Sequence, residues 1–70
     1  MRLSRHARNQ MRLYGIGRQD VEATLANPAD RATDERGNER LLGNAADGRP
    51  ILVVIARDDA SFVITVFVRS

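Results

Sequence analysis

The sequence predicts an α+β domain in which two N-terminal helices pack on one face of a four-stranded antiparallel sheet, in the order ααββββ. Two observations support this fold class. Residues 51–56 and 62–68 are apolar runs rich in β-branched and aromatic side chains, which favour strands. The N-terminal part instead repeats its apolar residues with a helical period. A chain of 70 residues has room for one small core, so we expect a single domain over residues 1–70.

The first helix is expected over residues 4–14. Ser4 is a favourable N-cap. At 100° per residue, four side chains fall within an arc of about 80° that should face the core: Leu3, Ala7, Met11 and Tyr14. Gly15 should end this helix and Gly17 should be the N-cap of a second helix over residues 18–26. The second helix should stop at Asn27-Pro28, because the residue before proline leaves the α region.

Four strands are expected after the helices. The first two, residues 31–36 and 39–43, form a polar hairpin around a two-residue turn, Gly37-Asn38. That register sets Arg36 opposite Glu39 and Glu35 opposite Arg40, two cross-strand pairs of opposite charge. The other two, residues 50–57 and 61–69, form the central hairpin around the polar turn at residues 57–61.

Composition excludes several classes of function. The chain has no cysteine and one histidine, which leaves no disulfide, thiolate–metal or polyhistidine site. We therefore predict no metal and no small-molecule cofactor. No stretch approaches the roughly 20 apolar residues of a membrane span, so we expect a soluble cytoplasmic protein without a membrane partner. All 11 basic residues are arginine. GC-rich coding would explain this, and so would phosphate recognition, which suits the planar guanidinium group.

The first helix carries a second pattern on its polar side. Arg5, Arg8 and Arg12 lie at i, i+3 and i+7 and form a basic stripe. This stripe is either a solvated face or a surface for the phosphates of a nucleic acid. Tyr14 either belongs to the core or stacks on a nucleobase.

The chain also resembles a known family. The segments Ser4-Arg5-His6-Ala7-Arg8-Asn9-Gln10-Met11-Arg12, Tyr14-Gly15-Ile16 and Asp20-Val21-Glu22 are similar to the opening of a small bacterial family of domains of unknown function. Arg40-Leu41-Leu42-Gly43 and Asp47-Gly48-Arg49-Pro50-Ile51-Leu52 continue the likeness. The second half is also similar to BrnT-type toxins, relatives of the RelE/ParE ribonuclease-toxin superfamily. The resemblance implies a RelE-like α2β4 fold and a link to RNA cleavage or to toxin–antitoxin pairing.

Two hypotheses of function follow. The first is a toxin-type, metal-independent endoribonuclease, an mRNA interferase or a diverged relative of one. Such cleavage needs acid–base groups and a cation for the phosphorane. His6 would supply acid–base chemistry, and Arg40, Arg57 and Arg69 would stabilise phosphate charge. This hypothesis predicts that His6 and at least two of these arginines converge on one groove.

The second hypothesis is a non-catalytic module that binds nucleic acid or protein with the same fold. It would use the Arg5–Arg8–Arg12 stripe together with Tyr14, or an exposed sheet edge. The partners considered are RNA, a cognate antitoxin and a second copy of the chain. These residues also have purely structural interpretations. His6 would then be a partly buried residue hydrogen-bonded to a backbone carbonyl, and Glu35 and Arg40 would form a cross-strand ion pair.

Overall fold

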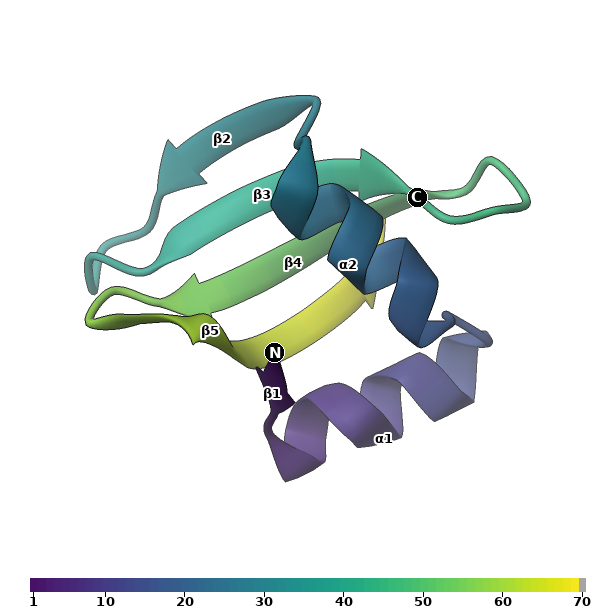
Figure 1. Ribbon diagram of the computed structural model, residues 1–70, viewed down its shortest axis with the longest axis horizontal. Helices are drawn as coiled ribbons and strands as arrows, with labels where there is room; N and C mark the ends of the chain where they lie inside the picture. Colours follow the sequence, from purple (N-terminus) through teal and green to yellow (C-terminus); the bar gives the residue numbers. More distant parts are fainter. Residues whose placement is uncertain (70) are drawn as a thin grey trace.

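The computed structural model describes residues 1–69 and contains two helices and a mixed five-stranded sheet (Figure 1). The strands are ordered β1-β5-β4-β3-β2 across the sheet. The elements, in chain order, are β1 (Arg2–Leu3), α1 (Arg5–Tyr14), α2 (Arg18–Ala26), β2 (Asp30–Thr33), β3 (Glu39–Asn44), β4 (Pro50–Ala56) and β5 (Asp59–Val68). The α+β class and both helix positions are therefore as the sequence predicts.

Both helices cover the same face of the sheet (Figure 1), and the core lies between the two layers. Ala7 and Met11 of α1 and Val21 of α2 pack there. The sheet contributes Leu41, Ile51, Val53, Ile55, Val63 and Val66, which alternate along β4 but not along β5, where the register with β4 shifts. Because side chains alternate between faces along a strand, the residues between these point to the face that no helix covers.

A fifth strand corrects the predicted four-stranded antiparallel sheet. β1 pairs with β5 in parallel, with Arg2 opposite Phe62 and Leu3 opposite Val63. Ser4 continues this contact, because its backbone N–H donates to the carbonyl of Val63 at 3.0 Å. Its hydroxyl also accepts from the N–H of Ala7 at 2.9 Å as the N-cap of α1. Residues 2–4 are therefore bound to the edge of the sheet. A strand of two residues has no apolar periodicity, so the sequence could not predict it.

The β2–β3 hairpin also differs from the prediction. β2 ends at Thr33, which lies opposite Glu39, so residues 34–38 form a five-residue loop in place of a two-residue turn. The reason is a side-chain cap, since Asp34 Oδ1 accepts from the backbone N–H groups of Arg36 and Asn38, each at 2.8 Å. Aspartate makes such local turns readily.

The shorter strand changes the charge pairs of this hairpin. Ala32 lies opposite Arg40, which removes the predicted Glu35–Arg40 pair. The predicted Arg36–Glu39 pair is replaced by Arg31–Glu39, with 3.5 Å between Nη1 and Oε1.

One contact caps α2, and two more set how it sits on the sheet. Asp20 Oδ2 accepts from the N–H of Gly17, the N-cap, at 3.0 Å, and Asp20 Oδ1 accepts from the N–H of Ala46 in the β3–β4 loop at 3.0 Å. Gly43 of β3 lies directly under Thr24, where a Cβ atom would come within 2.1 Å of the threonine Oγ1. α2 can therefore lie this close to β3 only over a residue without a side chain.

Candidate nucleic-acid interface

The face of the sheet without helices is apolar at its centre. Leu52 and Val54 of β4 point to this face, yet each is only 7% exposed. Side chains of the neighbouring strands must therefore cover them. Phe67 of β5 lies opposite Leu52 on this face and remains 39% exposed. We call this surface, with the arginines around it, the helix-free face.

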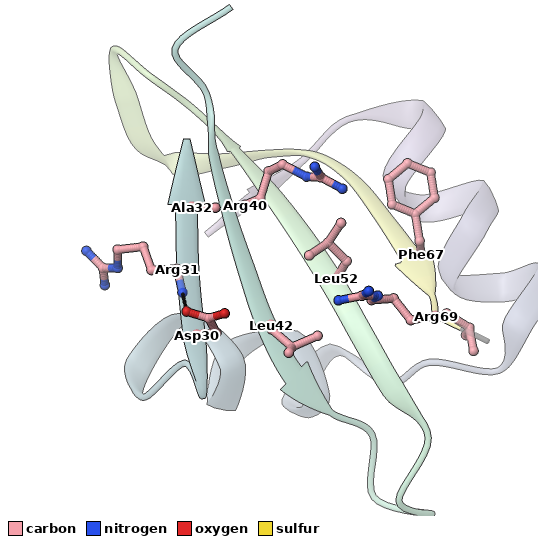
Figure 2. Close-up of a pocket in the computed structure, with 9 residues that line it drawn as sticks. Asp30, Arg31, Ala32, Arg40, Leu42, Leu52, Phe67 and Arg69 are labelled. Carbon is pink, nitrogen blue, oxygen red and sulfur yellow. Dashed lines mark hydrogen bonds between the residues drawn. The ribbon is translucent and has the colours of Figure 1, made fainter. Parts of the chain in front are cut away.

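Two of these arginines lie over the apolar centre. Arg40 comes from β3, and Arg69 directly follows β5. Figure 2 shows their guanidinium groups extending over the sheet on either side of Leu52, with the ring of Phe67 beside them. The hollow that they line has a volume of about 520 Å³. Its lining residues are Asp30, Arg31, Ala32, Arg40, Leu42, Leu52, Phe67, Val68 and Arg69.

The charge of this hollow is mostly positive. Three arginines and one carboxylate, Asp30, line it. Arg31 is paired with Glu39, whereas Arg40 makes no ion pair with any residue between 1 and 69. An exposed guanidinium beside an exposed aromatic ring is able to hold an anion and a flat apolar group at once.

A second hollow adjoins the first and shares Arg40 and Phe67 with it. Its far wall is the β2–β3 loop, which contributes the carboxylates of Asp34 and Glu35. Thr65 also lines it, and the Thr65 hydroxyl is buried without a hydrogen-bond partner in the described part of the chain. Arg36 and Arg40 also line this second hollow, so its two carboxylates are matched by two arginines, whereas the first hollow is mostly positive.

The predicted catalytic residues do not all meet. Arg40 and Arg69 line the same hollow, but neither His6 nor Arg57 does. His6 is exposed on α1, which covers the other face of the sheet. Arg57 follows β4 and supports the β2–β3 loop, where its Nη1 donates to the carbonyl of Arg36 at 3.4 Å. The predicted convergence of His6 with two strand arginines is therefore absent.

The predicted nucleic-acid surface of α1 lies on the helix side of the sheet. Arg5, Arg8 and Arg12 are exposed there, as the amphipathic pattern indicates. Tyr14 is 41% exposed and is not part of the core, which corrects its assignment to the apolar arc. The helix ends at Tyr14, and Gly15 turns the chain away with φ of 67°.

The sequence does not predict the roles of two residues, Phe67 in the hollow and Arg49 at the end of α1. The apolar run at residues 62–68 predicts only that Phe67 lies in a strand, and its position next to the buried Val66 is the signal that places it on the outer face. Arg49 caps α1 from the β3–β4 loop, where its Nη1 donates to the carbonyl of Tyr14 at 2.6 Å. Its backbone N–H also donates to Asp47 at 3.1 Å, which lowers the pKa of that carboxyl below its ordinary value. No local sequence pattern predicts the contact between Arg49 and Tyr14, because the two residues are far apart in sequence.

Within residues 1–69, no three histidine or acidic side chains lie close enough to hold a metal ion. No helix in that range is long and apolar enough to cross a membrane.

The comparisons with known proteins identify one family. The sequence model described as "Domain of unknown function (DUF4258)" matches residues 3–68. No curated protein and no solved structure gives a significant match to the chain. The match spans both helices and every strand from β2 to β5, so it includes the residues of the helix-free face except Arg69, which follows the matched range.

Proposed function

We propose that this chain, which belongs to the DUF4258 family of domains of unknown function, binds single-stranded RNA on its helix-free face. The observation that carries the proposal is the hollow in which Arg40 and Arg69 flank an apolar floor beside the exposed ring of Phe67. Guanidinium groups bind phosphates through paired hydrogen bonds. An exposed aromatic ring on a sheet offers a stacking surface for an unpaired base.

The shape of the face favours a single strand over a duplex. Proteins that read duplex DNA usually insert a helix or a ribbon into the major groove, and both helices here lie on the other side of the sheet. An open sheet with arginines at its rim suits splayed, unstacked bases. In this proposal the protein is a diverged, cytoplasmic relative of the RelE/BrnT-like toxins, and an antitoxin or a second copy is a further partner class.

Binding is tested by fluorescence anisotropy with a labelled single-stranded RNA at several salt concentrations. Arg40→Gln is expected to weaken binding about tenfold and to reduce the salt dependence, because one phosphate contact is lost. Phe67→Leu keeps apolar cover but removes the stacking ring, and a loss of about 1–3 kcal/mol is expected. Arg12→Gln on α1 is the matched control for charge. Equal losses from Arg40→Gln and Arg12→Gln would show that only net charge matters and would refute the assignment.

A second candidate function is metal-independent RNA cleavage. It is supported by Glu35 and Arg40, which line the same hollow, since a carboxylate base and a guanidinium are two of the groups that such cleavage requires. His6 has no part in this version. Glu35→Gln should abolish cleavage of a labelled RNA in the presence of EDTA while binding persists, and it should relieve any growth arrest on expression. Cleavage by Glu35→Gln at the wild-type rate would exclude this role.

A further inference from the structure

A third hollow lies beside β1, the edge strand of the sheet, near the first residues of the chain. Four elements contribute to it. Its lining residues are Arg2 and Leu3 of β1, Arg8 of α1, Arg18 at the start of α2 and Phe62 of β5. Three of these five residues are arginines, and no acidic residue lines the hollow. Neither hypothesis drawn from the sequence brought these residues together.

Two of the arginines are held in place. The Arg2 guanidinium lies 5.3 Å from the centre of the Phe62 ring and pairs with Asp59. Arg18 Nη2 donates to the carbonyl of Met1 at 3.2 Å. Its Nε lies 3.7 Å from Glu22, a long contact between exposed groups that contributes little. These contacts use only some of the five N–H donors of each guanidinium. The others remain available beside the hollow.

The third arginine is unpaired. Arg8 is exposed and makes no ion pair or side-chain hydrogen bond with any other described residue. It is also the middle member of the Arg5–Arg8–Arg12 stripe, and only this member lines the hollow. The N–H groups of Arg8 therefore have no acceptor among the described residues and are free to donate to water or to an anionic ligand.

We propose that this hollow is a binding site for a phosphate monoester. A phosphate monoester carries close to two negative charges and three strong acceptor oxygens at neutral pH, which suits a hollow lined by three arginines and no carboxylate. At about 420 Å³ the hollow has room for more than the phosphate. The Phe62 ring and Leu3 offer apolar contact to the esterified group. The proposal is independent of RNA binding on the helix-free face.

The site is tested by NMR titration, because the Nε–Hε groups of arginine report ligand contacts directly. Inorganic phosphate and adenosine 5′-monophosphate are added separately, against sodium chloride at equal ionic strength. Saturable shifts are expected at Arg2, Arg8 and Arg18 but not at Arg36, which lies outside this hollow. Tighter binding of the nucleotide supports the monoester, whereas equal affinity for the two ligands would show that only the phosphate group is bound and would overturn the proposed contact of Phe62 and Leu3 with the esterified group.

Two matched variants distinguish binding at this site from a general effect of net charge. Arg8→Gln should weaken phosphate binding at least about tenfold, the loss expected for one charge-assisted contact. Arg12→Gln removes the same charge from the same helix and should change the affinity less than Arg8→Gln does, by about twofold at most, because Arg12 does not line the hollow and exposed charges without direct contact are partly screened by salt. Neither side chain makes a contact that holds the fold, so both variants should remain folded. Shifts that do not saturate, or equal losses in both variants, would overturn the proposal.

Discussion

Replacing Gly43 by alanine should push α2 away from the sheet. The added Cβ would come within 2.1 Å of Thr24 Oγ1, 2.8 Å of its Cγ2 and 2.9 Å of its Cβ. These atoms belong to a short, buried side chain whose hydroxyl donates to the carbonyl of Asp20 at 3.0 Å. They cannot move aside as the end of a long side chain would. The helix must therefore shift, and the core between α2 and β3 must open.

The expected cost follows from this overlap. Forcing an extra carbon into a packed core costs typically 1–3 kcal/mol, and the overlap here is severe. Gly43 has no positive φ, so alanine recovers about 0.4–1 kcal/mol by restricting the unfolded chain. We expect a net loss of about 2 kcal/mol. A domain of 70 residues has a total stability of roughly 3.5–10 kcal/mol, so this loss is a large fraction of it.

Urea denaturation followed by circular dichroism measures the effect. Asn44→Ala, an exposed change at the next residue of β3, is the control and should stay within about 0.5 kcal/mol of wild type. Thr24→Ala removes the two atoms at 2.1 and 2.8 Å. In the double variant it should therefore recover about 1 kcal/mol of the loss as a coupling energy. A Gly43→Ala protein as stable as Asn44→Ala, or no coupling to Thr24→Ala, would refute the close-packing argument.

Three further predictions concern the caps and the acidic turns. Gly17→Ser should stabilise the protein by about 0.5 kcal/mol in urea denaturation, because α2 has no side-chain N-cap bond and φ of −81° suits serine. Asp20→Ala should cost about 2 kcal/mol, since two backbone N–H groups lose their acceptor, and amide exchange at Ala46 should quicken. The Ser61 hydroxyl, which donates to Asp59 at 2.6 Å, is the main cause that lowers the pKa of Asp59 from 3.8. Because the folded pKa is depressed, this contribution is complete above pH 3.8 and is lost as the pH falls through the folded value. The stability advantage over Asp59→Asn, measured in urea, should therefore shrink only in that acidic range.

The candidate site was only partly visible in the sequence. The sequence predicts Arg40 and Arg69 as phosphate ligands, and both line the same hollow. Acid–base chemistry makes His6 a candidate in the sequence, but His6 lies on α1, which covers the other face of the sheet. The identity of a side chain indicates what it could do. Its place relative to residues more than thirty positions away depends on how the helices and strands pack.

The sequence by itself determined the elements whose signals are local. Ser4 and Gly15 mark the two ends of α1, Gly17 and Asn27 mark those of α2, and the two apolar runs mark β4 and β5. These signals act over a few residues, through backbone preference and the alternation of apolar side chains.

Only the tertiary structure decided the features that join distant segments. It added β1 to the edge of β5, brought Arg49 to the end of α1 and gathered Arg2, Arg8 and Arg18 around one hollow. It also left one face of the sheet open beneath Arg40. Such contacts bring together residues from separate elements, and their geometry arises from packing those elements against a common core, which no short stretch of sequence encodes.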